Sequence, residues 1–283
     1  IECSAMALEH LGPTVDLHGG GLDLVFPHHE NEVAQSEGRN GKPLARHWMH
    51  NGFVEVDKTK MGKSLGNFFT VRQILEQHGY EPEAMRWAVM TVHYRSPLNF
   101  DWTLDDAGKV TGFPLFAESE KKVEYLYTTI ERLRSIDPSR IVPAVSVDGA
   151  ATPPAVPPAI AGFRQAVAAA LDDDLNMPIA LAETGEMLKA VNEVVDQTRL
   201  KKNNIVSRAT IDAAELALTA LRAELGLGAG DATVFLRRIR DRRAKARGLT
   251  DADVEARIAG RKAARDARDF ARADALRDEL TAM

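Results

Sequence analysis

The chain of 283 residues contains one cysteine, Cys3, so an intrachain disulfide is excluded. A lone thiol is typical of a reducing compartment, and we expect a cytoplasmic protein whose cysteine has a chemical role or none. The sequence also lacks any run of about 18 apolar residues, which excludes a membrane-spanning helix. No charged segment followed by an apolar one opens the chain, which argues against secretion.

Charge is unevenly distributed around a net value of −5. Residues 231–283 carry 14 Lys or Arg and 10 Asp or Glu, whereas the other 230 residues carry 22 and 31. A basic tail on an acidic body favours a polyanionic partner for the tail. Charge alone leaves open the simpler alternative that the tail is a solvated helix face.

Strand-like and helix-like patterns alternate over residues 1–70. We expect a helix that stops at Gly12-Pro13, a strand running into glycines at 14–21, and a helix beginning at Pro27. The apolar run LDLVF at 22–26 indicates a buried strand end, and HWMHNGFVEV indicates another strand before a polar loop. This alternation predicts an α/β domain with a parallel sheet, whose ligands bind at the carboxyl ends of the strands.

After residue 70 the apolar residues recur at helical spacing, so we predict an α/β region followed by an all-α region. A proline-rich stretch with six prolines interrupts the helices and is typical of a linker. The resulting division has five parts, which are residues 1–70, 71–140, 141–159, 160–228 and 229–283.

The segment FPHHENE contains a pattern suited to metal binding. His28 and Glu32 are four residues apart on a predicted helix, so their side chains share one face. His29 instead shares a face with Val33, which favours His28 as the ligand. An imidazole, a carboxylate and the thiol of Cys3 can together hold zinc. The alternative is a histidine at a helix start beside a solvated glutamate.

Two further segments are typical of nucleotide binding. The glycines of HGGG, Gly20 among them, allow close approach of the backbone to a ligand. His18 can bond a phosphate or carboxylate, and Asp23 can accept from ribose hydroxyls. In the loop KMGKS, Lys60 and Lys63 can close over a triphosphate and neutralise leaving pyrophosphate. A plain turn and a plain surface loop are the respective alternatives.

The ordered segments ECSAM, HGGGLDLVFPHHENEVAQSE and KMGKS resemble the cysteinyl-tRNA synthetase family of class I synthetases. KMGKS is similar to the family's KMSKS loop, with Gly62 replacing the first serine. The resemblance implies that residues 1–70 are the second half of a Rossmann-type catalytic domain. It also implies that Cys3, His28 and Glu32 bind zinc, with a fourth ligand, a cysteine, in an upstream half absent from this chain.

The same resemblance implies a reaction and a set of partners. ATP with Mg and cysteine would form cysteinyl-adenylate, and the zinc would receive the substrate sulfur as thiolate, which favours cysteine over serine. His18, Gly20, Asp23 and Lys63 would bind the adenylate, and Lys60 and Lys63 would act in catalysis. The acyl group would then pass to tRNA(Cys). A monomer is the family expectation.

The later segments extend the resemblance over nearly the whole chain. Residues 71–140, which include HYRSPLNFDW, resemble the family's stem-contact region. Residues 160–228 resemble the family's helix bundle. The segment RDFARADALRDEL resembles the C-terminal end of family members. Residues 229–283, with the basic run Arg237–Arg247, would bind the anticodon. The family's HIGH signature is missing from this chain. The segment that looks most like it, His10-Leu11-Gly12-Pro13, ends a predicted helix, whereas HIGH follows a strand in the family. We therefore expect a C-terminal part that is inactive alone.

Two alternatives to an aminoacyl-tRNA ligase remain open at this level. One is a paralogous zinc-dependent cysteine ligase with a small amine acceptor, against which the basic tail argues. The other is a non-catalytic tRNA-binding fragment.

Overall fold

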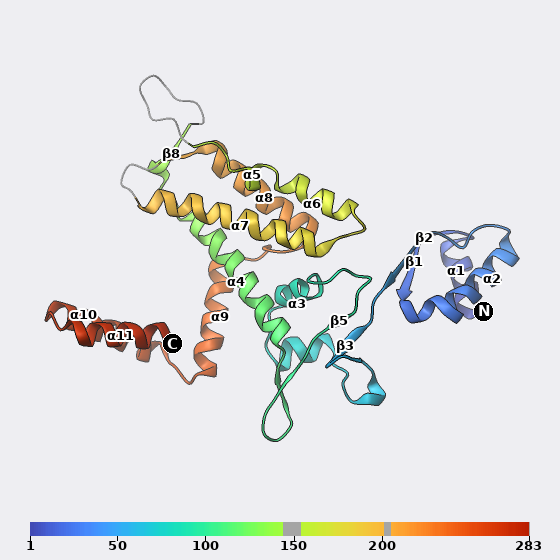
Figure 1. Cartoon of the computed structure of the whole chain (residues 1–283), viewed down its shortest axis with the longest axis horizontal. Helices are drawn as coiled ribbons and strands as arrows, with labels where there is room; N and C mark the ends of the chain where they lie inside the picture. The colour runs from blue at the N-terminus through green and yellow to red at the C-terminus, as the bar shows by residue number, and fades with distance from the viewer. Residues whose placement is uncertain (144–153, 201–204, 283) are drawn as a thin grey trace. The chain divides into compact units, whose positions relative to one another are not determined.

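The structure, a computed structural model, describes residues 1–143, 154–200 and 205–282. Its backbone contacts divide the chain into two compact units, Ile1–Ala229 and Gly230–Met283 (Figure 1). The first begins as mixed α/β structure and continues as helices, which confirms the expected fold class. The five-part division stays a prediction, and most of its proline-rich linker lies outside the described residues. Among the described helices, none combines the length and apolar character needed to cross a membrane.

Residues 1–51 form a small α/β layer. Its elements are α1 (Glu2–Leu11), β1 (Val15–Gly21), α2 (Glu30–Asn40) and β2 (Ala45–Asn51). The two strands pair in parallel from Val15 opposite Ala45 to Gly21 opposite Asn51. Parallel pairing requires a crossover, which α2 provides, so both strands end at the same edge of the sheet. The predicted helix stop at Gly12 and the predicted strand at 14–21 are both confirmed.

The expectation that LDLVF is a buried strand end is wrong. The run forms a 3-10 turn (Leu22–Leu24) followed by a π-helical turn (Val25–His29). Its Phe26 side chain is 76% exposed. A short apolar run does not by itself distinguish a strand from a turn of helix, and here the chain must turn directly from β1 into α2.

The predicted strand HWMHNGFVEV is divided between two sheets. After β2 the chain passes Gly52 and enters a sheet built from β3 (Val54–Val56), β4 (Thr59–Lys60) and β5 (Leu98–Asn99). A β-carbon on Gly52 would overlap the backbone of Ser96 and Pro97, so only glycine fits at this junction. The β3–β4 hairpin turns through Asp57 and Lys58, both at positive φ, and a 3-10 turn follows (Lys63–Leu65).

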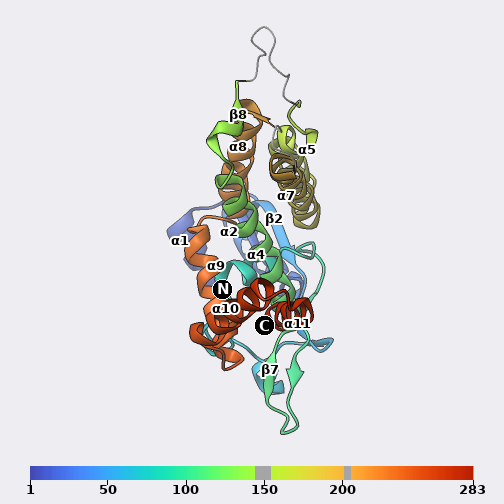
Figure 2. The same ribbon diagram turned by 90° about the vertical axis from the view of Figure 1, so that its left-hand side faces the viewer.

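An aromatic core supports this second sheet. The surrounding elements are a π-helical turn (Gln73–Gln77), α3 (Pro82–Val89), the hairpin β6 (Thr103–Leu104) and β7 (Val110–Gly112), and α4 (Pro114–Arg134) (Figure 2). The buried core residues are Val56, Ile74, Ala88, Phe100, Phe113 and Phe116. Tyr80 anchors the start of α4, because its hydroxyl donates to the Phe113 carbonyl at 3.1 Å and accepts from the Phe113 amide at 2.8 Å.

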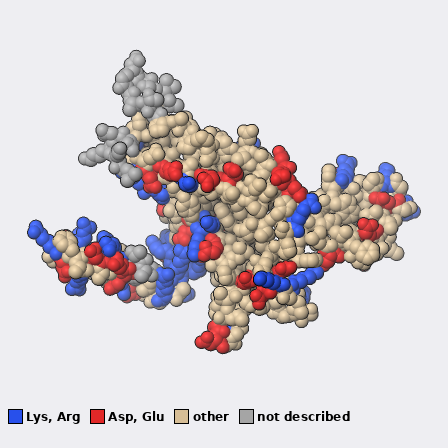
Figure 3. All heavy atoms as spheres, viewed as in Figure 1, with Lys and Arg blue, Asp and Glu red and all other residues tan. Residues whose placement is uncertain are grey.

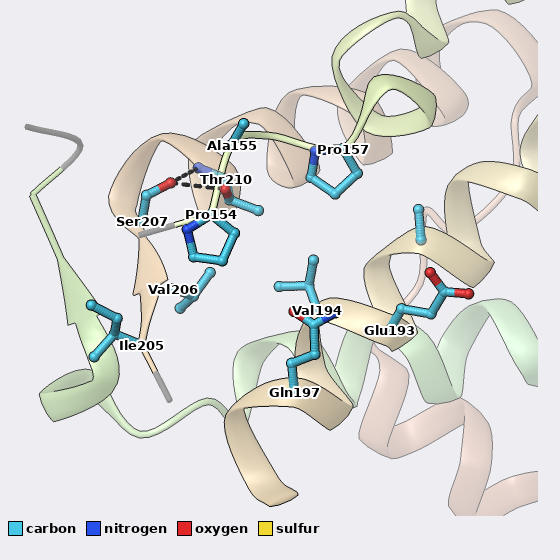
Figure 4. Close-up of a pocket in the computed structure, with 11 residues that line it drawn as sticks. Pro154, Ala155, Pro157, Glu193, Val194, Gln197, Ile205, Val206, Ser207 and Thr210 are labelled. Atoms are coloured by element: carbon cyan, nitrogen blue, oxygen red, sulfur yellow. Dashed lines mark hydrogen bonds between the residues drawn. The ribbon is translucent and has the colours of Figure 1, made fainter. Parts of the chain in front are cut away.

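A helix bundle completes the first unit, and α4 packs against it through α7 (Figures 1 and 2). Its elements are a 3-10 turn (Pro138–Arg140), β8 (Ile141–Val142), α5 (Pro158–Ala161), α6 (Phe163–Asp172), α7 (Met177–Leu200), β9 (Val206–Ser207) and α8 (Arg208–Leu225). Ser207 caps α8 by accepting from the Thr210 amide at 3.0 Å (Figure 4). The cap lines a cavity of about 210 Å³ that lies apart from the elements carrying the predicted site residues.

The second unit is helical. It consists of α9 (Ala232–Ala246), α10 (Asp251–Asp266) and α11 (Phe270–Ala282). A capping box starts α10, in which Thr250 and Asp253 bond each other's backbone amides. Helices α10 and α11 pack as a hairpin, in which Leu276 lies beside Gly260. Lys and Arg side chains gather over α9 (Figure 3).

Replacement of Phe116 by alanine tests the aromatic core. Phe116 is 1% exposed and contacts Tyr80, Phe100 and Phe113, so the truncation leaves a cavity. We expect the free energy of unfolding to fall by about 3–5 kcal/mol in urea titrations. The same change at Phe26, which is 76% exposed, should alter it by less than about 0.5 kcal/mol. Equal effects of the two variants would contradict this core.

Candidate metal and nucleotide site

The carboxyl ends of β1 and β2 bring the predicted site residues of the α/β layer together. β1 supplies His18 and the glycines, and the first turn of α2 follows directly with Glu32. Helix α1 packs against α2, which brings Cys3 near α2. The ends of neighbouring parallel strands are the usual ligand site of such sheets.

Cys3, His28 and Glu32 converge as the sequence pattern predicts. Their ligand atoms all lie within 4.8 Å of one another. The His28 Nε2 and Glu32 Oε1 atoms are 3.6 Å apart across one helical turn. Cys3 and His28 are exposed and Glu32 is buried. A thiol, an imidazole and a carboxylate at this spacing fit a zinc ion, and the exposed pair leaves the site open on the solvent side.

His18 lies against the same carboxylate. Its Nε2 donates to Glu32 Oε2 at 2.9 Å, so each oxygen of Glu32 faces a different histidine. Metal-binding carboxylates are commonly oriented by a hydrogen bond to their second oxygen. Contact of His18 with an adenylate stays a prediction, and within this chain its Nε2 is bonded to Glu32.

A second layer of aromatic side chains lies behind these groups, and the sequence reasoning missed it. His29 is 5% exposed, and its Nδ1 lies 2.8 Å from His50 Nε2. The Trp48 ring contacts His18, His29 and His50. Burial and, secondarily, the nearby His18 lower the pKa of His29 and favour its neutral form. The signal was the two-residue spacing of Trp48 and His50, which places both on one face of β2.

The ligand atoms of His18, His29 and Glu32 also lie within 4.8 Å of one another. Glu32 is therefore common to two groups of possible ligands.

The glycines at the end of β1 have a packing reason in this chain. A β-carbon on Gly19 would lie 2.6 Å from the Met49 carbonyl oxygen. A β-carbon on Gly20 would lie 2.8 Å from Leu24 and 3.1 Å from the His29 ring. Close packing of the two strands and of the turn therefore requires glycine here. Contact of Gly20 with a nucleotide stays a prediction.

Two of the predicted nucleotide residues meet. Lys60 Nζ lies 2.8 Å from Asp23 Oδ2 and 4.5 Å from the centre of the Phe53 ring. The hydrogen bond from Lys60 lowers the pKa of Asp23. Asn67 steadies the loop by accepting from the Gly62 amide at 2.9 Å and donating to the Lys60 carbonyl at 3.3 Å. Lys63 lies instead beside Phe68, with its Nζ 5.5 Å from the ring centre.

Comparison with known proteins identifies the family of this chain. Residues 1–108 match the family model for the catalytic domain of class I (C) tRNA synthetases, and residues 166–229 match the model for the DALR domain. A cysteine--tRNA ligase of Syntrophotalea carbinolica is 42% identical over the whole chain, and one of Geobacter sulfurreducens is 41% identical. Each alignment covers 54% of the relative, so the chain spans about half the length of the curated relatives it matches.

Among solved structures, a Mycobacterium tuberculosis methionyl-tRNA synthetase aligns with a TM-score of 0.47 and 16% identity, covering 78% of this chain and 43% of that one. The assignment comes instead from the two domain matches and from the full-length alignment of this chain with named relatives. The chain belongs to the cysteine--tRNA ligase family of class I aminoacyl-tRNA synthetases.

Proposed function

We propose that this chain carries the zinc site, the KMSKS-type loop and the RNA-binding helices of an ATP-dependent cysteine--tRNA ligase. ATP and cysteine give cysteinyl-adenylate and pyrophosphate, and the cysteinyl group then passes to the terminal ribose of tRNA(Cys). The observation that carries the proposal is the convergence of Cys3, His28 and Glu32 beside the paired Asp23 and Lys60. A thiol-selecting metal and a phosphate-binding lysine would thereby belong to one proposed active site.

Cys3, His28 and Glu32 would hold the zinc, and His18 would orient Glu32. When bound, zinc supplies a soft cation that prefers a thiolate to a hydroxyl, because a hydroxyl stays protonated at neutral pH. A hydrophobic pocket alone separates such similar side chains poorly. The exposure of Cys3 and His28 leaves the side of the site toward solvent free for the substrate.

Asp23, Lys60 and Lys63 would bind ATP with its Mg. Asp23 would accept from ribose hydroxyls, while the two lysines would neutralise the charge that develops as pyrophosphate leaves. Asp23 and Lys60 bind each other in this structure, at 2.8 Å. Nucleotide binding would exchange that contact for bonds to the ligand, at small cost because both side chains are about half exposed. His18 and Gly20 complete the proposed adenylate site from β1.

The remaining part of the ligase would cover the open sheet. Parallel sheets in α/β proteins are covered on both faces, yet this chain gives β1 and β2 no third strand within the described residues. Around them Leu11, Leu17 and Phe26 are 68%, 61% and 76% exposed. We propose that the additional sequence found in the longer relatives supplies further strands beside β1 and β2, together with a fourth zinc ligand. The complete enzyme would be a cytoplasmic monomer.

The second unit offers a surface for RNA. A groove of about 400 Å³ between α10 and α11 is lined by Ile258, Arg261, Lys262, Arg265, Asp266, Phe270 and Leu280. The Phe270 ring is 64% exposed. An exposed ring among cationic side chains suits an unstacked base and its phosphates. We therefore propose that tRNA(Cys) places anticodon nucleotides in this groove, with the basic helix α9 contributing phosphate contacts.

The alternative acceptor, a small amine, is not favoured by the relatives, which are named cysteine--tRNA ligases. The basic helix α9 of the second unit supports an RNA acceptor. A purely non-catalytic fragment is not favoured either, because the catalytic-domain match includes the metal triad and the KMGKS loop.

Cys3→Ser tests the metal site. Loss of the thiolate should lower zinc affinity at least about 100-fold in competition with a chelator. It should also abolish the sulfur-to-metal absorption band of the cobalt-substituted chain. His10→Gln, at the other end of α1, is the matched control and should leave both unchanged. Wild-type affinity and an intact band in Cys3→Ser would contradict the assignment of Cys3.

The purified 283-residue chain should show no cysteine-dependent ATP–pyrophosphate exchange. The reason is the incomplete sheet beside the nucleotide residues, which leaves the adenylate without a second wall. The full-length Syntrophotalea carbinolica relative serves as the positive control under identical conditions. Exchange above background by the chain alone would show that its residues suffice for activation.

Phe270→Ala should weaken binding of a tRNA(Cys) transcript about tenfold or more, because base–aromatic stacking contributes ~1–3 kcal/mol per base. Circular dichroism should stay unchanged, since the Phe270 side chain is largely exposed. Leu216→Ala, at an exposed position of α8, is the control and should bind normally. Equal affinities of Phe270→Ala and wild type in filter binding would remove the groove as the RNA site.

A further inference from the structure

One carboxylate joins the helix bundle to the sheet that carries the KMGKS loop. Asp174 lies in the corner between α6 and α7, beside the segment that joins α3 to β5 (Figure 1). Tyr94 donates its hydroxyl to Asp174 Oδ1 at 2.7 Å. Arg95 donates from Nε to Oδ2 at 2.6 Å and from Nη2 to Oδ1 at 3.2 Å. His93 Nε2 lies 3.0 Å from the Asp174 carbonyl oxygen, so three consecutive residues contact one aspartate.

The corner itself has an unfavourable backbone conformation. Asp174 and Leu175 have φ of 53° and 55°, in the left-handed region that residues other than glycine rarely adopt. Such conformations persist only where the surroundings impose them. The bidentate contact with Arg95 and the bond from Tyr94 provide this constraint, and together they lower the pKa of Asp174 to about 2. The Leu175 and Asn176 amides also donate to the Leu171 and Ala170 carbonyls at 3.0 and 2.9 Å, so local backbone bonds and the contacts with residues 93–95 hold the corner together.

Residues 94–98 also contact the junction at Gly52 between β2 and β3. The Tyr94 carbonyl accepts from the Gly52 amide at 2.7 Å, and the Leu98 amide donates to the Phe53 carbonyl at 2.8 Å. Ser96 and Pro97 fill the space where a side chain on residue 52 would lie. Tyr94 thus binds the bundle with its phenol and the junction between β2 and β3 with its backbone.

That junction separates the two halves of the proposed site. β2, before it, carries Trp48 and His50 of the histidine layer. β3, after it, leads through a tight hairpin to Lys60 in β4 and to the KMGKS loop. A continuous set of hydrogen bonds therefore runs from Asp174 through Tyr94 to Gly52, and the paired strands β3 and β4 connect it to Lys60.

We propose that Asp174 is a positioning residue of the ligase, which holds the bundle on the β2–β3 junction and couples tRNA binding to the placement of the KMGKS loop. The coupling rests on the proposed function, whereas the joint rests on the contacts alone. Asp174 acts through Tyr94 and Arg95 and touches no substrate. Removal of its carboxylate should increase the mobility of both the α6–α7 corner and the β2–β3 junction.

Hydrogen exchange of the full 283-residue chain tests the joint. In Asp174→Ala, exchange should rise about tenfold in peptides covering 49–60 as well as in 170–178, because the Gly52 amide loses its support. Tyr94→Phe should do the same more weakly, and Asp174→Glu should restore protection. Asp212→Asn, an exposed aspartate on α8, is the matched control and should change neither region. A rise confined to 170–178 would reduce Asp174 to a local helix-end contact and overturn the proposal.

The coupling is tested by adding a tRNA(Cys) transcript. Wild type should show slower exchange over 57–66 when RNA binds. Asp174→Ala should bind RNA within about threefold of wild type but lose that protection, whereas Asp174→Glu should keep it. Persistence of the protection in Asp174→Ala would refute the coupling. If wild type binds no tRNA, the proposed function and the coupling both fail. Hydrogen exchange of the chain without RNA still tests whether Asp174 holds the bundle on the β2–β3 junction.

Discussion

The carboxylate of Glu32 is the point on which the α/β layer depends. It is buried, and a buried charge is tolerated only with partners. One oxygen faces His28 on the π-helical turn before α2, and the other accepts from His18 on β1. The strand and the helix are therefore fixed by the group that the proposed metal would use. The glycines beside it follow from the same requirement, since any side chain at Gly20 would push the His29 ring away.

The two sides of the proposed site differ in how firmly they are held. On the metal side, burial, parallel strand pairing and stacked aromatic rings leave little freedom. On the nucleotide side, Lys60 and Asp23 are about half exposed, and a contact of that kind is weak and readily exchanged. A rigid metal side suits selection by coordination chemistry, whereas a loop that would close on and release pyrophosphate in the proposed reaction needs contacts of low cost.

Local sequence patterns predicted the elements that carry the site, and physical reasons explain where they failed. The four-residue spacing of His28 and Glu32 is a property of one helix, so it could be read directly. LDLVF could not, because apolar character does not report whether anything covers the residues. The contact of Tyr94 with Asp174 spans 80 positions and arises from packing of the bundle, so no local pattern contains it. The partners of His29 were missed because they lie on another element, β2.

The neutral state of His29 connects these observations to the chemistry. Burial disfavours its imidazolium form, and the nearby His18 opposes a second positive charge. Glu32 alone pulls the other way, since its carboxylate raises the pKa of His29. A neutral His29 adds no positive charge that could balance the carboxylate of Glu32. A dication held by the proposed zinc ligands would balance that carboxylate, and the exposed Cys3 and His28 are the groups through which it would be reached from solvent.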